Sequence, residues 1–98
     1  MVEKINLKEK VNSGGAYNDS DELAKNTDRI HTTDLGAGRI KKNLGLKTGD
    51  IVSWCVKKIE NAEKIIRRGK NWYVYSGGVV ITINAKSYTV ITAHKSPV

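Results

Sequence analysis

The chain of 98 residues is poor in several residue types: it has one cysteine, one methionine, one proline and no phenylalanine. A single cysteine, Cys55, excludes an internal disulfide framework and a zinc site built on cysteines, and we expect a reducing compartment, the cytoplasm. Without phenylalanine, the core must come from Val, Ile and Leu together with Trp54 and Trp72. The apolar stretches are too short for a membrane span or a signal peptide, so neither is expected.

Negative charge is scarce in the second half of the sequence. The whole chain has 17 Lys and Arg against 10 Asp and Glu, a formal net charge of +7. Residues 51–98 hold eight Lys and Arg but only two Asp and Glu, so this half carries +6 of that charge. Such asymmetry favours an anionic partner, which could be nucleic acid, an acidic protein or an acidic membrane surface. The alternative is a solvated surface that only keeps the protein in solution.

A chain of this length forms one domain, residues 1–98. Its expected parts are an N-terminal arm and loop at 1–19, a helical part at 20–60 and an antiparallel sheet at 64–95. Within the first part, residues 1–11 form either a short helix or an arm, and the composition of residues 12–20 predicts a loop.

Three helices are expected before the sheet. They are one over about 21–30 after a Ser20 cap, one from the N-cap Thr33 to Gly45, and one over about 49–60 after Thr48. The third has the clearest amphipathic pattern. Cys55 lies in its apolar stripe, so we interpret this thiol as a core residue and not as a nucleophile.

Two glycines stand inside the second expected helix. Gly36 and Gly38 each cost roughly 1 kcal/mol relative to alanine in a helix interior. They therefore indicate the close approach of another chain segment or of a ligand, such as a phosphate bound by backbone N–H groups. The other interpretation is a frayed first turn.

Three or four short strands follow the helices. They are expected at 64–68, 71–75, 79–84 and 87–94, because β-branched and aromatic residues alternate there between turn sequences. In the last strand Tyr88, Val90, Thr92 and His94 would share one face, and the pattern leaves open which face is buried. Helices followed by an antiparallel meander indicate an α+β fold, with two or three helices packed on a three- or four-stranded sheet.

A family resemblance rests on three stretches. They are HTTDLGAGRIKKNLGLKTGDIVSWC at 31–55, GKNWYV at 69–74 and ITINAKSYTVITAHK at 81–95. Together they resemble a family of small uncharacterised bacterial and phage proteins, a domain of unknown function, over roughly residues 30–95. This resemblance implies a family and supplies no activity.

A second resemblance concerns the layout of the chain. A histidine before a helix containing Arg39 and Ile40, a further helix, a GKNWYV strand and a closing TVIT strand are similar to the RelE/ParE-like and BrnT-like toxins. These belong to the barnase–EndoU–colicin E5/D group of ribonucleases. The resemblance implies helices leading into a small antiparallel sheet, and metal-independent RNA cleavage. The ParE branch has no nuclease activity, so the fold alone does not decide the activity.

Metal-independent RNA cleavage needs a base for the 2′-hydroxyl, an acid for the leaving 5′-oxygen and fixed charges for the transition state. Histidine serves the first two roles best near neutral pH, and the chain has two, His31 and His94. We expect them to meet across the sheet edge, with His31 as base, His94 as acid and Arg39 holding the phosphate. Either histidine could instead be an ordinary surface residue.

The remaining candidates would bind nucleic acid through charge or stacking. The expected contacts are Lys42, Arg68, Lys70 and Lys95 with phosphates, and Tyr73 and Tyr75 with bases. Tyr88 would join the stacking residues if it is exposed. Tyrosine is also common in strands for reasons of packing alone.

These observations predict a small basic protein that engages nucleic acid, in its sharpest form a metal-independent endoribonuclease of toxin type. The alternative is a non-catalytic binder, such as a phage or mobile-element inhibitor of a host nucleic-acid enzyme or defence system. The expected partner is RNA or another nucleic acid, or else an acidic protein such as an antitoxin or a target enzyme. No membrane partner, cofactor or metal is expected.

Overall fold

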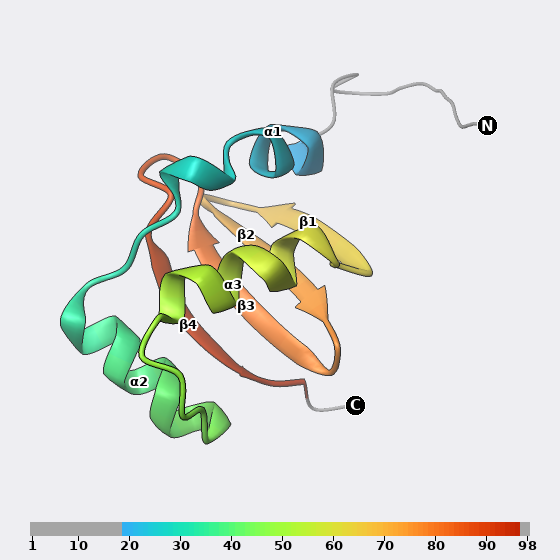
Figure 1. Cartoon of the computed structure of the whole chain (residues 1–98). Helices are drawn as coiled ribbons and strands as arrows, with labels where there is room; N and C mark the ends of the chain where they lie inside the picture. The colour runs from blue at the N-terminus through green and yellow to red at the C-terminus, as the bar shows by residue number, and fades with distance from the viewer. Residues whose placement is uncertain (1–18, 97–98) are drawn as a thin grey trace.

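The computed structural model describes residues 19–96 of the chain. Within them the elements are α1 (Asp19–Lys25), a 3₁₀ turn η1 (Thr27–Arg29), α2 (Asp34–Leu44), α3 (Ile51–Glu60), β1 (Lys64–Arg68), β2 (Asn71–Ser76), β3 (Val79–Asn84) and β4 (Val90–Lys95). This order confirms the expected α+β fold (Figure 1). The helix or arm expected at 1–11 and most of the loop expected at 12–20 lie outside the described residues. None of the helices in the described part has the length and apolar character that a bilayer crossing requires.

The four strands form an antiparallel meander in the order β1-β2-β3-β4. Val74 pairs with Ile65 on one side and with Ile81 on the other, and Ile81 pairs with Ala93. Paired residues in neighbouring strands point to the same face, so these four side chains share one face of the sheet. The helices pack on this face, with α3 lying across it and α2 along β4 (Figure 1).

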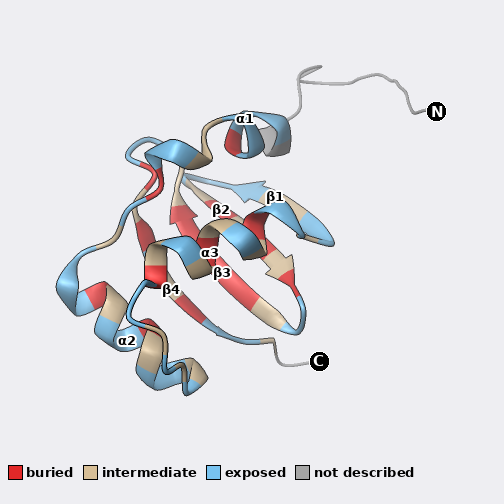
Figure 2. Ribbon diagram, viewed as in Figure 1, coloured by how far each residue is buried: buried red, intermediate tan, exposed pale blue. Residues whose placement is uncertain are grey.

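The core fills the space between the helices and this face of the sheet. Its buried members are Leu23, Ile30, Ile40, Ile51, Cys55, Ile59, Trp72, Val74, Ile81, Ile83, Tyr88, Val90 and Ala93. The outer side of each helix is exposed (Figure 2). Cys55 is fully buried, which confirms its assignment to the core. Burial raises the pKa of its thiol to about 12, so the reactive thiolate is not formed near neutral pH.

Capping residues explain where α2 begins and ends and where α3 begins. Thr33 caps α2 as expected, because its Oγ1 accepts the N–H of Gly36 at 3.0 Å, and Gly45 ends the helix in a left-handed conformation with φ of 65°. The expected cap of α3 is wrong, since Asp50 and not Thr48 holds that position. The Asp50 carboxylate accepts the backbone N–H and the hydroxyl of Ser53 at 2.9 and 2.8 Å, and these bonds lower its pKa.

The first helix ends earlier than expected. It begins at Asp19, so Ser20 lies inside the helix and not at its cap, and it ends at Lys25. The chain then forms the separate turn η1 before Ile30 enters the core.

Tyr88 lies in the loop before β4 and is buried, so the exposure that a stacking role requires is absent. The edge of its ring packs against Trp72, with ring centres 5.2 Å apart, and the Arg29 guanidinium lies 4.1 Å from its ring centre. Its φ of 62° is in the left-handed region, which costs a non-glycine residue on the order of 1–3 kcal/mol. Burial of the ring against Trp72 offsets that cost.

A β-bulge breaks the expected alternation of the last strand. Neighbouring residues of β3 pair with Val90 and with Thr92, so Ile91 between them is an extra residue. As a result Val90 and Ala93 both enter the core. Thr92 and His94 point to the opposite face of the sheet.

Gly36 allows α2 to approach β4 closely. A Cβ atom at this position would lie 2.5 Å from Thr32 Oγ1, and that hydroxyl donates a hydrogen bond of 3.0 Å to the carbonyl of Val90. The approach of a chain segment therefore explains this glycine. A Cβ atom at Gly38 would have nothing within 4 Å among the described residues.

The two glycines give a matched pair of substitutions. Gly36→Ala should lower the free energy of unfolding by about 1–3 kcal/mol, because the added methyl group displaces Thr32 from Val90. Gly38→Ala should raise it by about 0.5–1 kcal/mol through helix propensity alone. Urea unfolding followed by circular dichroism measures both, and a change of the same sign in the two variants would contradict the assignment.

Candidate nucleic-acid interface

The sheet face opposite the helices is formed by alternate residues of the four strands. They are Lys64, Ile66 and Arg68 of β1, Asn71, Tyr73 and Tyr75 of β2, Val80, Thr82 and Asn84 of β3, and Thr92 and His94 of β4. We call this set the open face. None of its members belongs to the core between sheet and helices.

A hollow of about 410 Å³ lies in the open face. It is lined by Ile66, Arg68, Tyr73, Tyr75, Val80, Thr82, His94 and Ser96. Val80 and Thr82 are almost completely covered, although no helix residue lines the hollow. The larger side chains of the open face itself therefore flank this open space, whose volume is in the range typical of ligand sites.

Tyr73 and Tyr75 lie side by side in the hollow. They are alternate residues of β2, so they point to the same face about 7 Å apart along the strand. Both rings are half-buried. Lys64 pairs with Tyr75, and its Nζ lies 5.8 Å from the centre of that ring. Arg68, at the other end of β1, completes a positively charged border beside the two rings.

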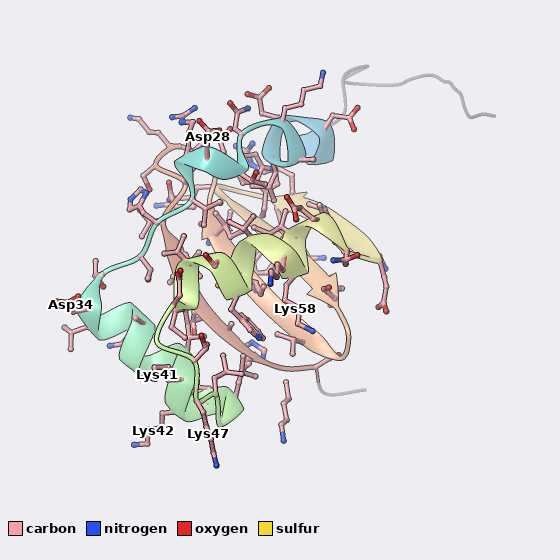
Figure 3. The ribbon with its side chains drawn as sticks, in the orientation of Figure 1. Asp28, Asp34, Lys41, Lys42, Lys47 and Lys58 are labelled. Atoms are coloured by element: carbon pink, nitrogen blue, oxygen red, sulfur yellow. The ribbon has the colours of Figure 1, made fainter. Side chains whose placement is uncertain are left out.

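No carboxylate side chain belongs to the open face. Residues 64–96 contain six Lys and Arg and no Asp or Glu, and the acidic residues of the described part all fall within 19–63. Figure 3 shows two of them, Asp28 on η1 and Asp34 at the start of α2. The charged side chains of the open face, Lys64 and Arg68, are therefore both positive, which favours an anionic ligand.

His94 lines the hollow on the β4 side. Its Nδ1 lies 3.0 Å from the carbonyl oxygen of Lys95. Because a carbonyl only accepts, Nδ1 carries the hydrogen, and this contact assigns the tautomer. In the neutral ring Nε2 is then an acceptor, and it has no hydrogen-bond partner among residues 19–96.

His31 occupies a different part of the molecule and both of its ring nitrogens are engaged. Nδ1 lies 3.0 Å from the Arg29 carbonyl, and Nε2 lies 2.9 Å from the hydroxyl of Thr89. His31 also forms a parallel β-bridge with Thr89. It therefore ties the segment before α2 to the start of β4.

The structure does not bring the two histidines together. Thr89, the bridge partner of His31, precedes His94 by five residues of extended chain, a separation of about 15 Å. One phosphate group cannot contact both rings across that distance, so the expected acid–base pair is not formed.

The other candidates are dispersed. Arg39 and Lys42 lie on exposed positions of α2. The side of α2 that faces the sheet is marked by Asn43, which donates a hydrogen bond of 3.2 Å to the carbonyl of Ala93. Figure 3 shows Lys42 projecting from the molecule near the end of the helix. Lys95 pairs with Val79 and so belongs to the helix-covered face. Lys70 is exposed in the turn between β1 and β2.

The sequence analysis did not identify Lys64 as a site residue. It also missed four residues that line the hollow with the tyrosines, namely Ile66, Val80, Thr82 and Ser96. The signal for Lys64 was present, because a two-residue turn at 69–70 pairs Arg68 with Asn71 and therefore Lys64 with Tyr75. No comparable signal was available for Ser96, which follows the bulged strand.

Within residues 19–96 no three or more His, Cys, Asp or Glu side chains are grouped so that they could hold a metal ion. The polar groups that line the hollow are Arg68, Tyr73, Tyr75, Thr82, His94 and Ser96. This set suits an organic anion with flat rings and hydroxyl groups.

The different surroundings of the histidines predict different effects on stability. His31→Ala should lower the free energy of unfolding by about 1 kcal/mol, because it removes hydrogen bonds to Arg29 and Thr89. His94→Ala, at an exposed position, should change it by less than about 0.5 kcal/mol. Chemical unfolding of the two variants under the same conditions measures the difference, and an equal loss in both would show that the His31 contacts contribute nothing.

A family model described as a protein of unknown function, DUF3781, matches residues 24–94. The match covers α2, α3, β1, β2 and β3 completely and reaches His94 in β4. It confirms the expectation of an uncharacterised family, whereas the similarity to ribonuclease toxins stays a prediction. No curated protein and no solved structure matches the chain.

Proposed function

The chain belongs to the DUF3781 family of proteins of unknown function, and we propose that its open face binds single-stranded nucleic acid, with RNA as the expected ligand. One observation carries the proposal. Two neighbouring tyrosines stand in a hollow bordered by Lys64 and Arg68, on a face without a carboxylate.

Stacking would supply the affinity for bases. A base stacked on an aromatic side chain contributes about 1–3 kcal/mol and tolerates any sequence. Tyr73 and Tyr75 offer two such surfaces, and the apolar side chains of Ile66 and Val80 line the same hollow. Bases reach such a surface only when they are unpaired, and the major groove of A-form RNA is too deep and narrow to admit a sheet face. A single strand is therefore favoured over a duplex.

Charge and hydroxyl groups complete the match to RNA. Lys64 and Arg68 would contact phosphates beside the rings, as expected for a groove that follows the backbone of a single strand. The hydroxyl of Thr82 and Nε2 of His94 line the same hollow and can bond to the 2′-hydroxyl. That hydroxyl is the group by which proteins distinguish RNA from DNA.

Fluorescence anisotropy with a labelled single-stranded oligoribonucleotide tests the proposal. Tyr73→Ala or Tyr75→Ala should weaken binding about 5- to 150-fold, the equivalent of one lost stack. The matched variants Tyr73→Phe and Tyr75→Phe keep the ring and should bind nearly as well as the wild type. Lys57→Ala, on the exposed side of α3, serves as the control for a change remote from the open face.

Three results would refute the binding proposal. They are no binding by the folded wild type, full binding by both alanine variants, and equal affinity for duplex RNA of the same sequence.

The position of His94 favours a second candidate function, metal-independent RNA cleavage. Nε2 of the neutral ring would take the proton of a 2′-hydroxyl bound in the hollow, as a general base. The 2′-oxygen would then form a bond to phosphorus while the bond from phosphorus to the 5′-oxygen breaks, and the 5′-oxygen would take a proton from solvent. The products are a 2′,3′-cyclic phosphate and a free 5′-hydroxyl. Arg68, also lining the hollow, supports the charged transition state.

Incubation of single-stranded RNA with the protein in the presence of a chelator tests cleavage. The wild type should give cyclic phosphate ends, and His94→Ala should slow the reaction about 10²- to 10⁴-fold, the usual contribution of a general base. His31→Ala should cleave at the rate of the wild type, provided that the variant is folded. Unchanged cleavage by His94→Ala would dismiss the histidine, and intact RNA in all reactions would leave binding as the function.

A further inference from the structure

Positive charge continues from the hollow over one end of the sheet. β1 ends at Arg68, and Gly69 and Lys70 make the turn to β2. The turn after β3 begins at Ala85, whose N–H donates to the carbonyl of Lys70 at 2.8 Å. The two turns therefore lie side by side, and the exposed Lys86 of the second turn lies one residue from this contact.

The second turn has a fixed backbone. The side-chain oxygen of Asn84 accepts the N–H groups of Lys86 and Ser87 at 3.0 and 2.9 Å, and the Ser87 hydroxyl at 3.1 Å. The carbonyl of Asn84 accepts the N–H of Tyr88 at 2.8 Å, and the ring of Tyr88 is buried in the core. Lys86 thus projects from a backbone whose position is set before any ligand binds, which reduces the ordering cost of binding.

Arg68 connects the hollow to this end of the sheet. It lines the hollow, and it pairs with Asn71, which in turn pairs with Asn84 next to the second turn. The carboxylate of Asp28 in η1 lies away from this row, because Asp28 lines a separate groove together with residues of α3. The segment that carries the row from Arg68 to Lys86, residues 64–96, contains no Asp or Glu.

We propose that one strand of nucleic acid enters the hollow with its bases and continues over Arg68 to the two turns, where Lys70 and Lys86 bind its phosphates. This inference rests on the proposed function and adds the path and minimum length of the ligand. Lys64 to Arg68 spans about 13 Å of strand, and phosphates of a stacked strand follow one another about every 3.4 Å. The path therefore takes a strand of at least about four nucleotides.

The salt dependence of binding tests the path. Each phosphate contact with a single strand contributes about −0.7 to the slope of log affinity against log salt. For a labelled decauridylate, the double variant Lys70→Ala/Lys86→Ala should therefore reduce the magnitude of that slope by about 1.4. A diuridylate, which is too short to reach the turns from the hollow, should bind the double variant and the wild type alike.

The matched control is the double variant Lys47→Ala/Lys57→Ala. It loses the same charge from exposed positions, one before α3 and one within it, so its slope should equal that of the wild type. An unchanged slope in Lys70→Ala/Lys86→Ala, or an equal reduction in the control, would overturn the path while Tyr73-dependent binding stands. No binding of decauridylate by the wild type would refute the proposed function as well. Polyglutamate that displaces decauridylate at equal charge would show that the end of the sheet fits an acidic protein.

Discussion

The packing of α2 and α3 against one face of a four-stranded sheet is the constraint from which the other features follow. Side chains alternate along a strand, so burial of Trp72 and Val74 under the helices sends Tyr73 and Tyr75 to the other face. Between the two tyrosines and β4 lie Val80 and Thr82 of β3, whose side chains are almost completely covered. The helix-covered face provides the stability, and the open face is left available for a ligand.

Two local departures from regular structure decide where the histidines lie. The bulge at Ile91 lets β4 bury two core residues and still present His94 beside the hollow. At the other end of β4, the left-handed Tyr88 turns the chain so that Thr89 meets His31. His31 therefore has a structural role, and of the two histidines only His94 lies on the open face. The same loop holds Lys86 next to the first turn, so one packing arrangement also extends the basic surface.

Local signals in the sequence predicted most of the fold. The capping residue Thr33 and the apolar spacing around Cys55 located α2 and α3, and alternating residues between turn sequences located the strands. The bulge at Ile91 was not predictable, because the residues around it have no local sequence signature for it. The burial of Tyr88 likewise depends on residues far away in the chain. For the site, strand alternation placed both tyrosines correctly on one face, whereas the distance between the histidines required the three-dimensional structure.

The segregation of charge links the fold to the proposed function. Residues 64–96 form a sheet with no acidic side chain, and every described carboxylate side chain lies in 19–63.

The most direct test of this account is a ¹H–¹⁵N NMR titration of the protein with a single-stranded oligouridylate. The account predicts that the largest amide shift changes fall on β1, β2 and the residues around His94, with α3 nearly unchanged. Changes concentrated on the exposed sides of α2 and α3, with β1 and β2 silent, would contradict it.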